Sequence, residues 1–128
     1  MKKYLTIVAS ITLGGLFIMA SVVVLFDLVR AMPPPEGSPA RMFMGAMGPT
    51  GYLKFVKIFE LAGGILVMIP RLRNIGLLLL GPVIVNIIAF HTFITHGEGL
   101  LNPMLDIIIV CALYLLWDAR KKFAGLLN

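Results

Sequence analysis

Four long apolar runs constrain the fold of this chain more than any other feature. They span about residues 4–29, 51–69, 75–95 and 103–118, and short segments rich in proline, glycine and charge separate them. Apolar runs of about 18 residues or more are typical of transmembrane helices. The sequence therefore predicts one membrane domain covering residues 1–128, an all-α antiparallel bundle of four transmembrane helices.

The composition supports a membrane protein. Of the 128 residues, 59% are hydrophobic and 13% are charged, whereas about 25% of a soluble domain is charged. The net charge of +5 would favour a nucleic-acid partner in a soluble protein. In this chain the basic residues lie at the ends of the apolar runs, where membrane topology explains them. We therefore expect the lipid bilayer as a partner, and no nucleic acid.

The N-terminal run begins like a secretory signal peptide, with Lys2 and Lys3 before an apolar stretch. Its uncharged part covers residues 4–26, which is longer than the apolar region of a signal peptide. We expect it to be retained as the first transmembrane helix. In the segment that follows, Ser38 and Pro39 have the pattern of an N-cap and a first helical residue. This pattern predicts a short interfacial helix over residues 40–47 in the first outer loop.

Lysine and arginine predict the orientation of the bundle. Cytoplasmic loops of membrane proteins carry an excess of these residues. Seven lie on one side of the predicted membrane and three on the other. We therefore expect a bacterial inner-membrane protein with both termini in the cytoplasm. The richer side holds Lys2, Lys3, Arg71, Arg73, Arg120, Lys121 and Lys122, and the other side holds Arg30, Arg41 and Lys54.

Polar side chains inside the apolar runs are the candidate binding residues. Lys57 and Glu60 lie about 9 and 13 Å below the outer end of the second run. Asn86 falls near the predicted midplane, and His91 and Asp106 fall in the outer third. A charged side chain at the centre of a membrane costs about 2.5–3.5 kcal/mol, so such residues face the bundle interior or a wet cavity. Asp27 closes the first run at the outer edge. We predict a polar layer of these six residues that opens outward.

The same residues also have a structural interpretation. Lys57 and Glu60 can neutralise each other and hold neighbouring helices without any ligand. Asn86 can form a hydrogen bond between helices, and Asp106 can cap the fourth helix. Asn86 and His91 lie about 140° apart on an ideal helix and need not share a face.

Small and helix-breaking residues are the candidates for helix packing. Two adjacent glycines in the second run allow close approach of helices, and Gly14 and Gly15 are their expected partners in the first run. The proline in the third run removes one backbone hydrogen bond and should kink that helix near Leu78. The packing candidates are Gly63, Gly64, Pro70 and Pro82.

Several kinds of chemistry are not expected. The single cysteine, Cys111, cannot form an intrachain disulfide, and His91 and His96 lie too close in sequence to hold a haem from facing helices. Methionine is a soft ligand suited to Cu(I), but methionine beside Phe43 on an interfacial helix is the commoner arrangement. We predict no metal site and no intrinsic cofactor. The methionines of the outer loop are Met32, Met42, Met44 and Met47.

The stretches "GYLKFVKIFELAGGILVMIPR" and "GLLLLGPVIVNIIAFHTFI" resemble the DoxX family of small four-helix membrane proteins. The resemblance covers about residues 40–95. It implies the fold, and it implies a link to quinone-dependent or oxidative-stress complexes, with which members of the family are associated. The residues it points to are Lys57, Glu60, Gly63, Gly64, Pro70, Asn86 and His91.

These observations lead to three hypotheses for function. The first is an accessory subunit that binds a quinone-like ligand for a partner membrane protein. The second is an assembly or scaffold protein, acting through lateral contacts with other membrane proteins or a second copy. The third is a small permease, for which four helices are few and no inverted repeat is visible. The chain has no redox cofactor motif, so we do not expect an enzyme that acts on its own.

Overall fold

The computed structural model describes residues 2–28, 34–97 and 100–126. Every regular element in these ranges is a helix, so the predicted all-helical class is confirmed. The elements are α1 (Lys2–Leu25), α2 (Pro39–Met47), α3 (Tyr52–Met68), α4 (Arg73–Ala89), the π-helical turn η1 (Phe90–Ile94), α5 (Pro103–Asp118) and α6 (Arg120–Ala124).

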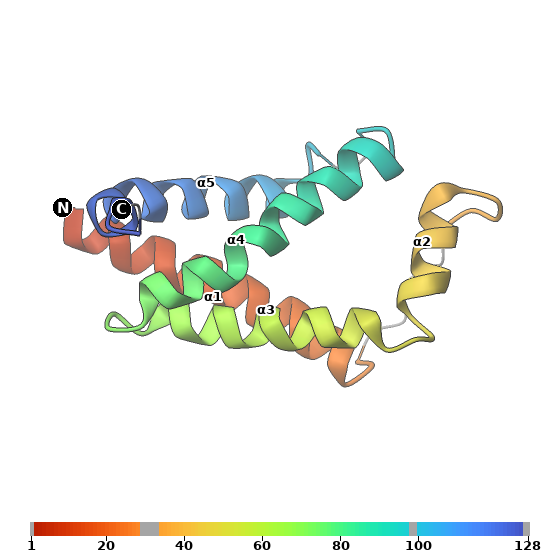
Figure 1. Ribbon diagram of the computed structural model, residues 1–128, viewed down its shortest axis with the longest axis horizontal. Helices are drawn as coiled ribbons and strands as arrows, with labels where there is room; N and C mark the ends of the chain where they lie inside the picture. Colours follow the sequence, from red (N-terminus) through yellow and green to blue (C-terminus); the bar gives the residue numbers. More distant parts are fainter. Residues whose placement is uncertain (1, 29–33, 98–99, 127–128) are drawn as a thin grey trace.

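The four long helices alternate in direction along the chain (Figure 1). Helix α1 packs against α3 and α5, and α3 also packs against α4. Both termini lie at one end of the molecule, together with the turn at residues 69–72. We call this the terminal end. The opposite end, which holds α2 and the turn between η1 and α5, is called the loop end.

Local signals determine where the helices begin and end. Ser38 caps α2 as predicted, since its hydroxyl oxygen accepts a hydrogen bond from the Arg41 N–H at 3.2 Å. Helix α1 ends at Leu25, earlier than the predicted boundary at residue 29, which lies outside the described residues. The reason is a Schellman turn, in which Asp27 has a φ of 51° and the Leu28 N–H bonds the Val23 carbonyl at 3.0 Å.

Close contacts between glycines hold the middle of the bundle together. Gly63 and Gly64 are adjacent on α3, so they face different neighbours. A Cβ on Gly64 would lie 3.0 Å from the Gly14 carbonyl oxygen of α1, and a Cβ on Gly76 of α4 would lie 2.9 Å from the Gly63 carbonyl oxygen. Gly15, the other expected partner, has no atom within 4 Å of its would-be Cβ. Helix α3 is therefore the central helix, with one glycine contact on each side.

Helix α4 continues through Pro82, and Figure 1 shows it bending and diverging from α3 toward the loop end. The proline has no N–H, so the Leu78 carbonyl lacks its usual helical partner. Beyond α4 the backbone widens into η1, where the Thr95 N–H bonds the Phe90 carbonyl at 3.2 Å, a spacing of five residues. Such a π-helical turn was not predicted.

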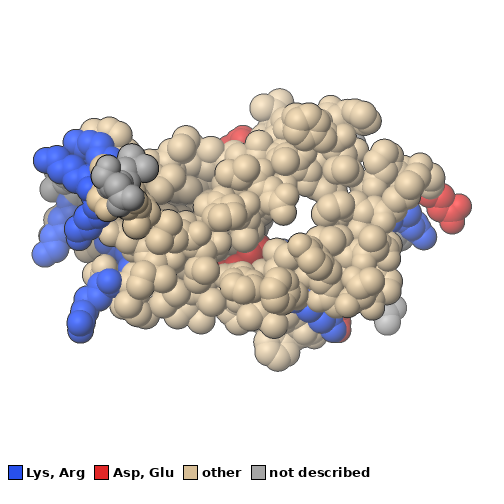
Figure 2. Space-filling view, in the orientation of Figure 1, with Lys and Arg blue, Asp and Glu red and all other residues tan. Residues whose placement is uncertain are grey.

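In the described part of the chain, two helices are long and apolar enough to cross a membrane by length and composition, Lys3–Leu25 and Arg73–Ile94. Helices α3 and α5 have 17 and 16 residues. On the face shown in Figure 2, most lysine and arginine side chains gather at the terminal end, and the surface between the two ends shows only small acidic patches. More large hydrophobic side chains are exposed than buried, which is typical of a surface that contacts lipid or another protein.

Candidate functional site

An ion pair lies inside the loop-end half of the bundle. The Lys57 Nζ is 3.2 Å from Oε2 of Glu60 and donates a hydrogen bond to Oε1 at 3.3 Å. Both residues lie on α3, three positions apart, so helical spacing brings them together. The Glu60 side chain is 4% exposed and that of Lys57 is 17% exposed. The carboxylate is therefore the buried partner, and the lysine extends toward the surface.

Two cavities flank this ion pair. The larger has a volume of about 380 Å³ and is called the α2 cavity; Figure 2 shows an opening between α2 and the ends of α3 and α4. The smaller, of about 180 Å³, lies toward α1 and α5 and is called the α5 cavity. Both are lined by Lys57, Glu60, Ile87 and His91. The charged pair therefore forms part of the wall between two spaces.

His91 presents a hydrogen-bond acceptor to this region. Its Nδ1 is 2.8 Å from the Ile87 carbonyl oxygen. A carbonyl can only accept, so Nδ1 carries the proton and Nε2 is left as an acceptor in the neutral ring. Nε2 has no hydrogen-bond partner among the described residues. The ring also packs edge-on against Phe90, with centroids 5.4 Å apart.

Asn86 lines the α2 cavity together with His91. Its side chain is exposed to this space and forms no hydrogen bond with the described residues. Asn86 and His91 both line this cavity despite their expected separation of about 140° around the helix, because the α2 cavity borders α4 and η1 over a wide arc. A primary amide offers both donors and acceptors, so Asn86 can bind a carbonyl or a hydroxyl group.

Asp106 and Asp27 do not join this group. Asp106 is half-buried one turn into α5 and lines neither cavity. It does not cap the helix either, because the Asn102 side chain accepts from the Met104 N–H at 2.9 Å and takes that role. Asp27 is exposed at the end of α1. The predicted polar layer is thus centred on α3, α4 and η1.

Sequence reasoning missed the contribution of α2 to the site. Phe43 of α2 packs on Phe90, with ring centroids 4.9 Å apart, and Met44 and Met47 line the α2 cavity. The aromatic and methionine pattern of residues 42–47 was the available signal. Three residues used in the sequence interpretation, Arg30, Met32 and Glu98, lie outside the described residues.

The remaining predicted residues are placed as follows. Pro70 is exposed in the turn that follows α3, and Pro82 is exposed within α4. Gly63 and Gly64 are buried in helix contacts near the ion pair. Together, these features define a class: an all-helical protein with two helices long enough to cross a membrane and a buried ion pair between cavities.

The chain is similar to an uncharacterized protein, YwoB of Bacillus subtilis (strain 168). The two are 29% identical over 108 residues, which is 81% of this chain and 68% of YwoB. Family models show no match to the chain, and solved structures show none. The resemblance to the DoxX family therefore stays a prediction.

Proposed function

We propose that this chain is a DoxX-like four-helix protein of the bacterial inner membrane, with both termini in the cytoplasm. Its function would be to bind a small quinone-like ligand as an accessory subunit of a membrane redox or stress-related complex. Helices α3 and α5, at 17 and 16 residues, correspond to about 24–26 Å. Spans slightly shorter than the hydrocarbon thickness are accommodated by local thinning of the membrane.

The observation that carries the proposal is the position of Glu60. It is one of the least exposed polar residues, and it lines both cavities, which reach different helices. Burial removes a carboxylate from water at a cost of several kcal/mol, which an ion pair offsets only in part. A carboxylate in a cavity wall can exchange hydrogen bonds or a proton with a ligand.

The cavity lining suits an aromatic ring that carries oxygen atoms. Phe43, Met44 and Phe90 supply apolar and aromatic walls, and methionine adapts well to ring edges. The Asn86 amide would donate to a ligand carbonyl, whereas Nε2 of His91 would accept from a ligand hydroxyl. These complementary groups match the oxidised and reduced forms of a quinone headgroup.

The test compares Glu60→Gln with Asp106→Asn, using protein purified from native membranes in mild detergent. Both substitutions remove an acid within the apolar region, but only Glu60 lines the cavities. Organic extracts are assayed for quinone and other lipophilic molecules per protein. We expect a near-stoichiometric ligand in the wild type and in Asp106→Asn, and its loss in folded Glu60→Gln. Retention of the ligand in folded Glu60→Gln excludes the proposed role of this residue.

A scaffold function is the second candidate, and the completeness of the ion pair favours it. Both Glu60 oxygens already lie within 3.3 Å of Lys57, so the pair needs no ligand to satisfy it. Exchange of the two residues, Lys57→Glu with Glu60→Lys, tests this alternative. A purely structural pair should regain much of the stability that each single substitution loses. Failure to regain it, together with a bound ligand in the wild type, favours the binding function.

A further inference from the structure

A second pair of cavities lies at the terminal end, remote from Glu60. One has a volume of about 370 Å³ and is lined by Lys3, Thr6, Ile7, Pro70, Arg73 and Asp118. The other, of about 290 Å³, shares Pro70, Arg73 and Asp118 with the first and extends to Lys121 and Lys122. We call the two together the terminal cavity. Its walls come from three separate parts of the sequence: α1, the start of α4 with the turn before it, and α5 with α6.

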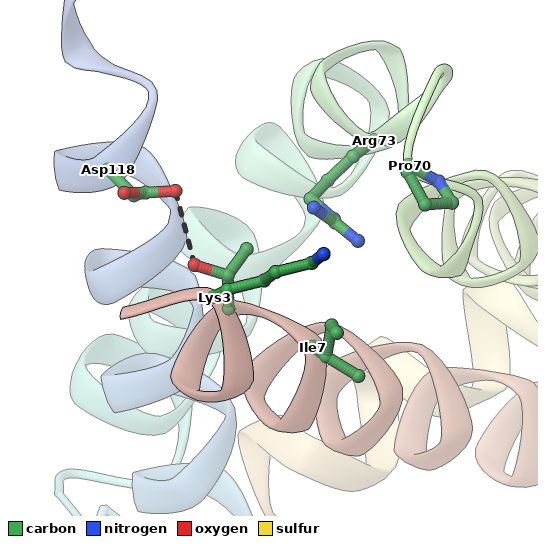
Figure 3. A pocket seen from close by; sticks show the side chains of 6 residues that line it. Lys3, Ile7, Pro70, Arg73 and Asp118 are labelled. Carbon is green, nitrogen blue, oxygen red and sulfur yellow. Dashed lines mark hydrogen bonds between the residues drawn. The ribbon is translucent and has the colours of Figure 1, made fainter. Parts of the chain in front are cut away.

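Four cationic side chains line the two parts of the terminal cavity. Lys3, Arg73, Lys121 and Lys122 line it, and none forms an ion pair with a carboxylate in the described part of the chain. Figure 3 shows the side chains of Lys3 and Arg73 extending toward one another from different helices. Like charges brought together repel, so this arrangement is most favourable when an anion lies between them.

Arg73 is held in place for such contacts. It is half-buried, and its Nε donates to the Val67 carbonyl at the end of α3 at 3.1 Å. This bond fixes the guanidinium group and leaves both terminal nitrogens without a partner among the described residues. An arginine with two free terminal nitrogens matches the geometry of a phosphate group.

The one acid in the lining, Asp118, offsets only part of this positive charge. Asp118 Oδ2 accepts a hydrogen bond from the Thr6 hydroxyl at 3.3 Å, drawn as the dashed line in Figure 3. With four cations and one anion in the lining, the local charge is strongly positive.

We propose that the terminal cavity binds a phosphate group, held between Lys3 and Arg73 with Lys121 and Lys122 on its far side. An anionic phospholipid headgroup is the source that the surroundings suit best. Ile7 lines the cavity, and Ile11, one turn further along α1, is exposed. An acyl chain can lie along this apolar face while the headgroup occupies the cationic cavity. The site is independent of the function proposed for Glu60.

The experiment titrates full-length protein in an uncharged detergent with dioleoylphosphatidylglycerol, dioleoylphosphatidylcholine or inorganic phosphate. Bound molecules are counted by native mass spectrometry. The test variants are Arg73→Gln and Lys3→Gln. Arg71→Gln is the matched control, since Arg71 lies two residues from Arg73, is exposed and lines neither part of the cavity. Because Arg73 also bonds the Val67 carbonyl, Lys3→Gln gives the answer if Arg73→Gln does not fold.

We expect phosphatidylglycerol to bind with at least a several-fold preference over phosphatidylcholine. Each test variant should weaken this binding by about five-fold, the effect of removing one cation near a phosphate, and Arg71→Gln should leave it unchanged. Competition by millimolar inorganic phosphate supports a site for the phosphate group itself, and binding of the lipid alone supports a lipid site. Equal weakening by Arg71→Gln indicates only diffuse surface charge and overturns the proposal. Absence of binding by every probe overturns it as well.

Discussion

The two ends of the molecule use charge in opposite ways. At the loop end, one lysine and one glutamate are inside the bundle and paired at 3.2 Å. At the terminal end, four cations surround a cavity without an ion-pair partner in the described residues. A buried charge must be paired to be tolerated, whereas an exposed charge can remain available for a ligand or a lipid surface. The difference predicts that leaving one charge unpaired lowers stability at the loop end, whereas removing one cation at the terminal end weakens binding with little effect on stability.

The largest effect is expected from Lys57→Met. The substitution keeps an unbranched side chain of similar length and removes the one ion-pair partner that Glu60 has among the described residues, where its side chain is 4% exposed. We expect stability to fall by about 3 kcal/mol, the low end for a broken buried pair, since the carboxyl group can take up a proton. Unfolding in detergent, followed by circular dichroism, measures the change.

Lys54→Met is the control for this substitution. Lys54 lies one turn earlier on α3 and is exposed, so its removal should change stability by less than about 0.5 kcal/mol. Similar losses for the two variants would show that the ion pair contributes nothing beyond general charge. The loop end would then not depend on a paired charge for its stability, and the difference between the two ends would not hold.

A smaller loss is expected from Gly14→Ala, which tests the contact that holds α1 to α3 between the two ends. A Cβ at Gly14 would lie 2.5 Å from the Gly64 carbonyl oxygen, and backbone atoms cannot move aside as a flexible side chain can. We expect a loss of about 2 kcal/mol, typical of overpacking. The same assay applies.

Gly15→Ala is the matched control, because nothing lies within 4 Å of a Cβ at that position. Alanine is the better helix former by about 1 kcal/mol, so this variant should be as stable as the wild type or more stable. A loss of stability in Gly15→Ala equal to that in Gly14→Ala would contradict the packing described for α1.

Helix positions were predictable because their signals are local. The Ser38-Pro39 pattern placed the start of α2 correctly, and the same kind of pattern at Asn102 and Pro103 marks the start of α5. Had the second pattern been used, Asn102 and not Asp106 would have been assigned as the cap. The apolar runs also gave the bounds of α3 to within one residue at each end.

The cavities were not predictable because they depend on tertiary structure. The α2 cavity needs the bend of α4, the widened turn η1 and the return of Phe43 to Phe90. None of these features follows from an apolar run. The same apolar residues can form either a π-helical turn or an α-helical turn, so composition does not distinguish the two. The terminal cavity was hidden for another reason, since Lys3 and Arg73 had already been explained by membrane topology.

The contact between α2 and η1 should contribute modestly to stability but strongly to the cavity. Phe43→Ala removes the ring that packs on Phe90 at 4.9 Å. We expect a loss of about 1 kcal/mol, the value of an aromatic pair, and faster release of any ligand extracted with the protein. A double-mutant cycle with Phe90→Ala isolates the pairwise term. A coupling energy near zero would show that α2 does not close the cavity.

The smallest effect on stability is expected at the terminal end. Lys121→Gln removes a cation that is exposed and has no ion-pair partner in the described residues. In uncharged detergent its stability should stay within about 0.5 kcal/mol of the wild type. The difference in stability between Lys121→Gln and the wild type should grow when phosphatidylglycerol is added, because only the wild type keeps the full set of cations around the phosphate.

Arg120→Gln is the control variant, since Arg120 stacks on Trp117 at 4.2 Å and does not line the terminal cavity. A lipid-independent loss in Lys121→Gln would mean that this lysine supports the fold, and the contrast between the two ends would disappear.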